Sequence, residues 1–498
     1  MVWACFLARL LFYSAMLPLW EGYDEWAHFA VVRHMAFGGH LLVSRDAPIP
    51  RDVEASLELA PVPWELRAFA PPAVTRDDYW RLSIDERERR QAALRTMPQS
   101  WGREDGSGPL KAYEALQPPL YYWLMTPALW ISQPFSLLTQ VLVLRFLSSL
   151  LASALIPLEF LLARDALGDD RAALGTAAIV ALMPGLALDV ARVGNDCLAV
   201  LLFTLLTWLV LRGASQNGFV LGLGLLTKAY FLTAIPVAWW GKRSRLLTVA
   251  ATVLIAAWWY IRNLRTTGTL SGLSESVMLR GMGIGEQIRR AAGLNWLQAI
   301  DAIFFSHLYF GGWSSLTVRS WMYHLFYLFI LAGAIGVVRL CRRPAIVILL
   351  ATYLSFWAGQ IYNVALLYIS KGLAGSMGWY MYAVVGAEVT LCVAGLRRLV
   401  PARVSAWLPA LGASLFALLD LYTVHAVAIP YYTGMIRHRA NGSLEAFHWA
   451  GLQSGVVDRL AVFVPPAMLV TLWLLYLLGT AGALACACAR KCDSAAKS

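Results

Sequence analysis

The chain is poor in charged residues. Asp, Glu, Lys and Arg make up 14% of its 498 residues, whereas about a quarter is typical of a soluble globular protein. Hydrophobic residues reach 59% and the mean hydropathy is +0.59. Apolar runs close to the roughly 20 residues that cross a bilayer recur along the sequence. This composition excludes a soluble enzyme and predicts an all-α polytopic membrane protein.

Cysteine is also scarce and gives no disulfide framework. Of the seven cysteines, Cys197, Cys341 and Cys392 lie in or beside apolar segments. Three others gather near the end of the chain, at Cys486, Cys488 and Cys492. No His or acidic pattern surrounds this group, so ordinary thiols are favoured over a metal site or an acylation site.

Internal repetition is lacking as well. No period of roughly 20 to 50 residues stands out, which argues against a repeat array. No two halves match, although many transporters are built from matching halves.

The net charge of +11 does not indicate nucleic-acid binding, which needs Lys and Arg gathered on one solvated face. Here the basic residues stand in short connectors between apolar segments, a pattern typical of cytoplasmic loops. These connectors are 164–171, 242–245, 339–343, 397–403 and 490–491. All of them fall on one side, with both termini in the cytoplasm, if the chain has about twelve spans.

We place the spans at 2–20, 143–163, 172–190, 196–212, 218–228, 229–241, 245–262, 322–340, 344–362, 378–396, 405–427 and 460–484. The first has Arg9 in its middle and no small-residue cleavage site, so it is expected to remain uncleaved. The segments 218–228 and 229–241 are too short to cross fully as helices. Lys228 at their junction must therefore be buried against protein, point into a cavity or lie near the outer surface.

The long segments 21–142, 263–321 and 428–459 fall on the outer side. The first opens with GYDEWAHFAVVRHM at residues 22–35, in which Trp26, Phe29, Ala30 and Val32 form one apolar side of a helix expected to lie along the membrane surface. An acidic pair there, Asp24 and Glu25, could act as a general base. The simpler alternative is that both carboxylates cap the helix and complement its dipole.

Three further polar segments fall on the same side. YEALQPPLYYWLMTPALW, residues 113–130, starts a helix at paired prolines and carries interfacial aromatic rings. ARVGNDCLAV, residues 191–200, places Arg192, Asn195 and Asp196 at a helix junction, with capping by Asn195 or Asp196 as the alternative. GLGLLTKAYF and WWYIRNLRTTG, residues 222–231 and 258–268, place cations where they could hold a phosphate or extend toward lipid headgroups.

Taken together and in this order, these segments resemble the GT-C superfamily of membrane glycosyltransferases, which includes protein O-mannosyltransferases and aminoarabinose transferases. The resemblance covers about residues 1–270 and includes a second span led by Arg145. It is closest to a bacterial branch with RN at 262–263, SHLYFGGW at 306–313 and GWYMYAVVGAE at 378–388. It implies a catalytic module at 1–270 containing the first outer loop, a further outer loop at 271–321, and a variable C-terminal module at 322–498.

The resemblance implies sugar transfer from a polyprenyl-phosphate donor to an extracytoplasmic glycan, lipid or protein, in a bacterial inner membrane with the site facing the periplasm or exterior. Asp24 matches the position of the catalytic acid of the family, with Glu25 as its neighbour or substitute. The residues expected to contact substrate are His28, Glu114, Gln117, Tyr121, Arg192, Asn195, Asp196, Lys228, Arg262 and Asn263. No closed metal-ligand set is visible, and a divalent cation, Mg or Mn, shared by the acidic pair and phosphate is left open.

Other functions remain open on the sequence. A lipid or glycolipid transporter or flippase would place ionisable groups near the bilayer midplane, whereas Glu159, Asp189 and Glu388 lie near predicted span ends. A non-catalytic scaffold would not need polar groups from four segments on one side. An O-antigen ligase or polymerase, or an acyltransferase, would rely on outer-loop basic residues or histidines. The histidines available are His28, His307, His425, His438 and His448.

Overall fold

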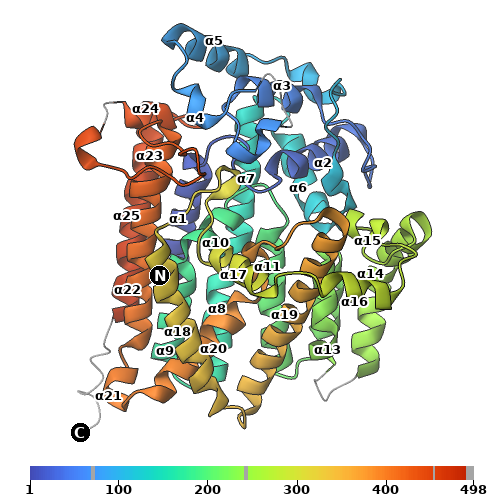
Figure 1. Cartoon of the computed structure of the whole chain (residues 1–498), viewed down its shortest axis with the longest axis vertical. Helices are drawn as coiled ribbons and strands as arrows, with labels where there is room; N and C mark the ends of the chain where they lie inside the picture. The colour runs from blue at the N-terminus through green and yellow to red at the C-terminus, as the bar shows by residue number, and fades with distance from the viewer. Residues whose placement is uncertain (69–72, 240–244, 453–454, 489–498) are drawn as a thin grey trace.

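The chain folds into a bundle of helices beneath an outer layer of short helices and loops (Figure 1). The computed structural model describes residues 1–68, 73–239, 245–452 and 455–488. Within these ranges the extended backbone forms isolated β-bridges and no named strand. The prediction of an all-α membrane protein is confirmed.

Seven helical segments in the described residues are long and apolar enough to cross a membrane. They are α7–α8 (Leu137–Leu167), α14 (Arg245–Thr267), α18 (Ser320–Val338), α19 (Pro344–Lys371), η6–α20 (Gly378–Leu399), α22–α23 (Leu408–Tyr432) and α25 (Pro466–Cys488). An eighth arises if α9 (Asp170–Leu182) and α10 (Pro184–Val190), which meet at 63°, form one broken span. Pro184 lacks the N–H that would continue the ladder of α9, which explains the break.

The four remaining predicted spans are helices too short to meet that length. They are α1 (Val2–Met16), α11 (Asp196–Leu211), α12 (Asn217–Leu225) and η4–α13 (Ala229–Ala238). Helices thus occupy all twelve predicted spans, and seven or eight of them in the described part of the chain are long and apolar enough to cross a membrane. The short pair before and after Lys228 was expected, because neither apolar run is long enough to cross.

The outer layer is formed mainly by the first long loop. Its helices are α2 (Glu25–Gly38), α3 (Arg51–Leu59), η1 (Trp64–Ala68), α4 (Arg76–Tyr79), α5 (Ile84–Arg95), η2 (Gln99–Arg103), η3 (Tyr113–Leu116) and α6 (Leu120–Ile131). Figure 1 shows α3, α4 and α5 at the top, above the bundle. Helix α2 does not expose its apolar side, because Trp26, Phe29, Ala30 and Val32 are all buried. It packs against protein on every face instead of presenting that side to lipid.

The two other predicted outer segments also carry short helices. These are α15 (Ser274–Met278), α16 (Ile284–Ala291), α17 (Trp296–Leu308), η5 (Gly312–Ser314), η7 (Thr423–Ala428), η8 (Trp449–Gly451) and α24 (Val456–Leu460). Both segments contact the first loop. The backbone N–H of Trp313 donates to the carbonyl of Glu21 at 3.0 Å, and the Trp80 indole donates to the carbonyl of Tyr432 at 3.0 Å. The three segments thus lie on one end of the bundle, as the charge pattern predicts.

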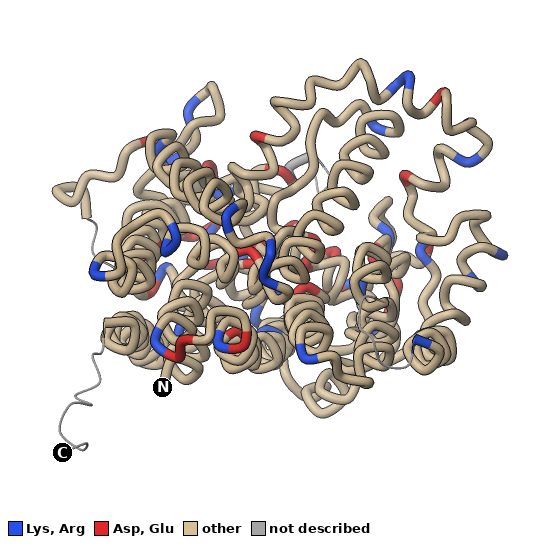
Figure 2. Tube along the Cα trace, turned by 90° about the horizontal axis from the view of Figure 1, so that it is seen from below, with Lys and Arg blue, Asp and Glu red and all other residues tan. Residues whose placement is uncertain are grey.

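The opposite end carries the short connectors. Helix α21 (Ala402–Ser405) lies there (Figure 1), and Figure 2, seen from below, shows Lys and Arg at several of the helix ends that face the viewer. Arg397 forms an ion pair with Asp169 at 2.7 Å, which joins two of the predicted cytoplasmic connectors. The predicted basic residues Lys242, Arg243, Arg490 and Lys491 lie outside the described residues, as does Cys492. The six described cysteines are free thiols.

Charged side chains inside the bundle have partners. Arg9, in the middle of α1, forms an ion pair with Asp420 of α22 at 2.7 Å, and both side chains are fully buried. Tyr13 and Tyr476 donate to the same carboxylate at 2.6 and 2.7 Å. Because a buried charge is tolerated only when paired and hydrogen-bonded, this cluster explains how α1 carries an arginine in its apolar run.

Candidate functional site

Asp24 stands at the start of α2 in an unusual backbone conformation. Its φ is 54° and its ψ is 18°, which is the left-handed region. A non-glycine residue there costs about 1–3 kcal/mol and often marks a functional position. Asp24 occupies the N-cap position, but its side chain makes no capping hydrogen bond. The capping alternative therefore does not hold for this carboxylate, which is partly exposed and accepts a hydrogen bond from the Tyr113 hydroxyl.

Glu25 is held differently. Its side chain is fully buried, and Arg145 donates Nε and Nη2 to its two oxygens at 2.7 and 2.6 Å. The backbone N–H of Val193 donates to Oε1 at 3.0 Å. Arg145 also donates to the carbonyls of Ser14, Leu17 and Pro18. Both carboxylate oxygens of Glu25 are thus used to join the end of α1 to α2 and α7 (Leu137–Ser153).

Arg192 is the centre of a buried charge cluster at the junction of α10 and α11. Its Nη2 donates to Asp189 Oδ1 at 2.9 Å and to Asp196 Oδ2 at 2.5 Å. All three side chains are nearly fully buried. Arg192 Nε and Nη1 have no hydrogen-bond partner within the described residues. Two donors of a buried guanidinium therefore remain available.

Two glycines make room for this guanidinium. A Cβ at Gly22 would come within 2.6 Å of Arg192 Cδ, and a Cβ at Gly194 would come within 1.9 Å of Arg192 Nη1. Real Cβ atoms do not approach other atoms so closely, so either position would force the arginine to move. Gly22 and Gly194 thus allow the segments 22–35 and 191–200 to pack closely around the Arg192 side chain.

Lys228, from the segment 222–231, also belongs to this charge cluster. It lies between α12 and η4, its side chain is 8% exposed, and its Nζ donates to Asp196 Oδ1. The ammonium also lies 5.5 Å from the ring centre of Tyr230 and 5.2 Å from that of Tyr380. Of the three placements that the sequence leaves open for Lys228, the structure shows burial against protein. Asp196 thus accepts from one cation on each oxygen.

Glu114 and His28 form a second group of polar side chains, next to the charge cluster of Arg192, Asp196 and Lys228. The ring of His28 meets the Tyr122 hydroxyl at 2.9 Å through Nδ1, and its Nε2 lies 3.7 Å from Glu114 Oε2. Tyr122 donates to the carbonyl of Glu114 at 3.1 Å. His28 of the segment 22–35 is therefore held against Glu114 and Tyr122 of the segment 113–130 in the outer layer.

Burial and charge shift the titration of these groups. Burial and the nearby charge of Asp24 raise the pKa of Glu114 to about 8, against the opposing effect of Lys228 and Arg192. Burial also raises the pKa of Asp24, while the hydrogen bond from Tyr113 and the charges of Arg192 and Lys228 lower it. Burial, with the same two cations, holds the pKa of His28 well below its usual value. Near neutral pH, Glu114 is therefore mainly protonated and His28 uncharged.

Hydrogen bonds that involve the main chain connect the segments 113–130, 191–200 and 222–231. The N–H of Gly194 donates to the Tyr121 hydroxyl at 3.0 Å, and the N–H of Leu120 donates to the carbonyl of Leu226 at 2.9 Å. Asn195 donates its side-chain amide to the carbonyl of Thr227 at 3.1 Å and makes no capping bond. The capping alternative for Asn195 is therefore wrong. Four segments that lie far apart in the sequence therefore converge at one end of the bundle.

The side chains of three predicted substrate-binding residues form no hydrogen bond or ion pair with Arg192, Asp196 or Lys228 among the described residues. Arg262 packs over the Trp259 ring at 5.1 Å, and Asn263 donates to the carbonyls of Leu270 and Ser271 at 3.3 Å. No hydrogen bond or ion pair within the described residues joins either one to Arg192, Asp196 or Lys228. The Gln117 side chain likewise makes no hydrogen bond among the described residues, although its N–H donates to the carbonyl of Glu114.

Sequence reasoning missed four residues that shape the site. Tyr113 was not singled out although it opens the YEALQPPLYY segment, and its hydroxyl is the partner of Asp24. Tyr23, directly before Asp24, places its ring 5.5 Å from the Arg192 guanidinium. Tyr380, whose ring lies beside the Lys228 ammonium, belongs to the GWYMYAVVGAE segment at 378–388, far along the chain from the other site residues. Asp189 had been weighed only as a transporter residue, yet it pairs with Arg192. Aromatic residues adjoining a charged motif were the available signal.

No group of three His, Cys, Asp or Glu side chains within the described residues is arranged to hold a metal ion. The chain also has a cavity of about 600 Å³ elsewhere, lined by residues 317–320, 421–427 and 436–449. None of the clustered residues lines it.

Comparisons with known proteins give one structural likeness. No protein-family model matches the chain, and no curated protein matches its sequence. The crystal structure of ArnT from Cupriavidus metallidurans bound to undecaprenyl phosphate is similar over 92% of this chain and 75% of that one, with 15% sequence identity and a TM-score of 0.41. Because this TM-score is below 0.5, the function is argued from the residues of the chain.

Proposed function

We propose that the chain is an integral-membrane glycosyltransferase of the GT-C type. It transfers a sugar from a polyprenyl-phosphate donor to an acceptor hydroxyl on the outer side of the membrane. The acceptor is a glycan, a lipid or a protein. Asp24 is the general base.

The observation that carries this proposal is the state of Asp24. It is the partly exposed carboxylate of the acidic pair, it lies in a strained backbone conformation, and no cation forms an ion pair with it within the described residues. Glu25, in contrast, has both oxygens occupied by Arg145. A carboxylate that is free to accept a proton is what a general base requires. We therefore assign the base to Asp24 and a supporting role to Glu25.

The cations beside Asp24 suit the leaving group. As the acceptor oxygen attacks the anomeric carbon, its proton passes to the Asp24 carboxylate. The bond from that carbon to the phosphate oxygen breaks, and polyprenyl phosphate leaves as an anion. Lys228 and Arg192 would stabilise the charge that develops on the phosphate. Their fixed contacts with Asp196 and Asp189 hold both cations in place before substrate binds.

The proposal is tested by sugar transfer in detergent from defined polyprenyl-phosphate sugars, comparing the wild type with Asp24→Asn. The asparagine keeps the acceptor for the Tyr113 hydroxyl but cannot take a proton. We expect the rate of transfer to fall by roughly 10²- to 10⁴-fold, the usual contribution of a general base. Donor affinity should change far less, because Lys228 and Arg192 are retained.

The matched control is Asp46→Asn. This carboxylate lies in the same loop, is exposed, and contacts only Arg45 at 3.5 Å among charged groups of the described residues. It should transfer sugar at the wild-type rate. Unchanged transfer in Asp24→Asn would exclude this residue as the base. Movement of the intact donor across a vesicle membrane without transfer would favour the flippase alternative instead.

A further inference from the structure

A cavity lies away from the charge cluster, at the outer ends of two membrane spans. Its volume is about 600 Å³, within the roughly 300–1,000 Å³ range of small-molecule sites. One wall is residues 317–320, which lead into α18. The second is residues 421–427 of the Leu408–Tyr432 span, and the third is the loop at residues 436–449. The cavity therefore lies where lipid headgroups meet the protein.

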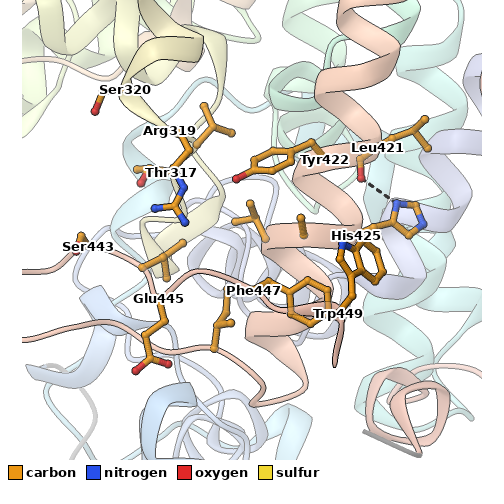
Figure 3. Close-up of a pocket in the computed structure, with 15 residues that line it drawn as sticks. Thr317, Arg319, Ser320, Leu421, Tyr422, His425, Ser443, Glu445, Phe447 and Trp449 are labelled. Atoms are coloured by element: carbon orange, nitrogen blue, oxygen red, sulfur yellow. Dashed lines mark hydrogen bonds between the residues drawn. The ribbon is translucent and has the colours of Figure 1, made fainter. Parts of the chain in front are cut away.

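Arg319 supplies the cavity with a cation that has no acidic partner. Its guanidinium makes no hydrogen bond or ion pair within the described residues. Figure 3 shows the side chains of Arg319 and Tyr422 pointing toward one another from opposite walls. The Glu445 carboxylate, which also lines the cavity, is turned away from Arg319 in this view and accepts the N–H of Arg437 at 3.2 Å. The positive charge is therefore not neutralised from within the cavity.

The rest of the lining suits an amphipathic molecule. The hydroxyls of Thr317 and Tyr422 also donate to no other group among the described residues. Ser320, His425 and Ser443 add further polar groups, and the apolar part of the lining is formed by Val318, Leu421, Val427, Ile436, Leu444 and Phe447. Trp449 lines the cavity and is 65% exposed. A tryptophan at this depth is typical of the membrane interface, where one part of the ring is apolar and the other wet.

We infer that this cavity binds the anionic, phosphate-bearing headgroup of a membrane lipid. Arg319 pairs with the phosphate, the Thr317 and Tyr422 hydroxyls donate to it, and the apolar lining covers the glycerol and the first methylenes of the acyl chains. A guanidinium is well suited to a phosphate because its planar N–H groups match two phosphate oxygens. This inference goes beyond the proposed function and does not depend on it.

The cavity is connected to the candidate active site through one short loop. Residues 317–320 are separated from η5 by Ser315 and Leu316. Ser314 of η5 donates its N–H to Glu21 Oε1 at 3.0 Å and its hydroxyl to Oε2 at 2.9 Å. The N–H of Gly312 in the same turn meets the Tyr23 hydroxyl at 3.3 Å. Glu21 and Tyr23 immediately precede Asp24. A lipid bound against Arg319 would therefore contact the loop whose residues 312–314 hydrogen-bond to the segment before Asp24.

The test measures binding of short-chain lipids to the purified full-length chain in detergent. The probes are dihexanoyl-phosphatidylglycerol, which is anionic, dihexanoyl-phosphatidylcholine, which is zwitterionic, and glycerol 3-phosphate. We expect the wild type to bind the anionic lipid more tightly than the zwitterionic one. Arg319→Gln should weaken binding of the anionic lipid about tenfold, the equivalent of one hydrogen bond to a charged group.

Arg95→Gln is the matched control, because it removes an exposed arginine of α5 that makes no hydrogen bond or ion pair in the described part of the chain. It should bind like the wild type. Ser443→Trp keeps Arg319 but fills the cavity from the exposed loop, and should weaken binding as well. This second variant decides the matter if Arg319→Gln does not fold. Equal binding by wild type and a folded Ser443→Trp or Arg319→Gln overturns the inference, as does equal affinity for the two lipids.

Glycerol 3-phosphate distinguishes the source of the phosphate. Binding that depends on Arg319 shows that the headgroup alone is recognised. Binding of the lipid without binding of glycerol 3-phosphate shows that the acyl chains are also needed. Both results support a phosphate site, and tighter binding of the free phosphate than of the lipid contradicts a lipid as the occupant.

Discussion

Arg145 holds both carboxylate oxygens of Glu25, at 2.7 and 2.6 Å, in the fully buried space where α1 ends and α2 begins. Among the residues that the structure describes, the adjacent Asp24 has no such partner. Asp24 has a positive φ and is partly exposed, whereas Glu25 is buried, so two neighbouring carboxylates face different environments. One is a structural anchor and the other is available for chemistry.

Glu25→Gln should destabilise the chain. The substitution removes the charge that compensates a fully buried arginine, and breaking one side of such a pair costs about 3–5 kcal/mol. We expect a clear fall in the apparent Tm of the purified protein in detergent. Asp24→Asn removes the same charge one residue earlier and should leave Tm nearly unchanged. Equal losses in the two variants would contradict the division of roles.

The convergence of the polar motifs on one site was predictable from the sequence. The positive-inside pattern places Asp24, Arg192 and Lys228 at the same end of the bundle, and a charge inside an apolar run needs a partner nearby. Hydrophobic length also predicted that the helices around Lys228 are short. These conclusions rest on local composition, which a single sequence contains in full.

The division between Asp24 and Glu25 was not predictable. Arg145 lies 120 residues beyond Glu25, and nothing in the local pattern says which carboxylate it meets. The same is true of Arg262 and Asn263, which lie on the expected side but turn toward their own helix and the following loop. The charge pattern of the connectors predicts on which side of the membrane a residue lies. Its hydrogen-bond or ion-pair partner is decided by tertiary packing.

Tyr113→Phe should move the pH dependence of transfer. The Tyr113 hydroxyl stabilises the charged form of Asp24, and this hydrogen bond lowers the pKa of the carboxyl against the effect of burial. Removing the hydroxyl therefore raises that pKa. A base must be deprotonated to act, so the acidic limb of the profile of kcat/KM should shift to higher pH. Tyr79→Phe, in the same loop but outside the site, is the control, and an identical acidic limb in both variants would exclude the contact.

Gly194→Ala should displace Arg192. The added Cβ would meet Nη1 at 1.9 Å, so the guanidinium must leave its contacts with Asp189 and Asp196 or the turn must open. Overpacking of this kind costs typically about 1–3 kcal/mol. We expect a lower Tm and a weaker affinity for the donor, measured together. Gly213→Ala adds a methyl group where nothing lies within 4 Å, although its φ of 62° adds backbone strain. It should therefore lower Tm without weakening donor binding, and the reverse pattern would contradict the assignment.

Glu114→Gln should change how stability depends on pH. Burial raises the pKa of this carboxyl from an ordinary 4.5 to about 8 in the folded chain. Between these two values the unfolded chain has released the proton and the folded chain still holds it. The wild type therefore loses stability as pH rises from about 4.5 to about 8, and the loss is complete above that value. Glutamine cannot titrate, so the Tm of Glu114→Gln relative to wild type should rise across this window and level off above it. Glu58→Gln, which removes an exposed carboxylate of the same loop, controls for the loss of a negative charge. A constant difference in Tm from pH 5 to pH 9 would show that Glu114 is ionised in the folded protein, and would add one negative charge to the surroundings of the phosphate of the proposed donor.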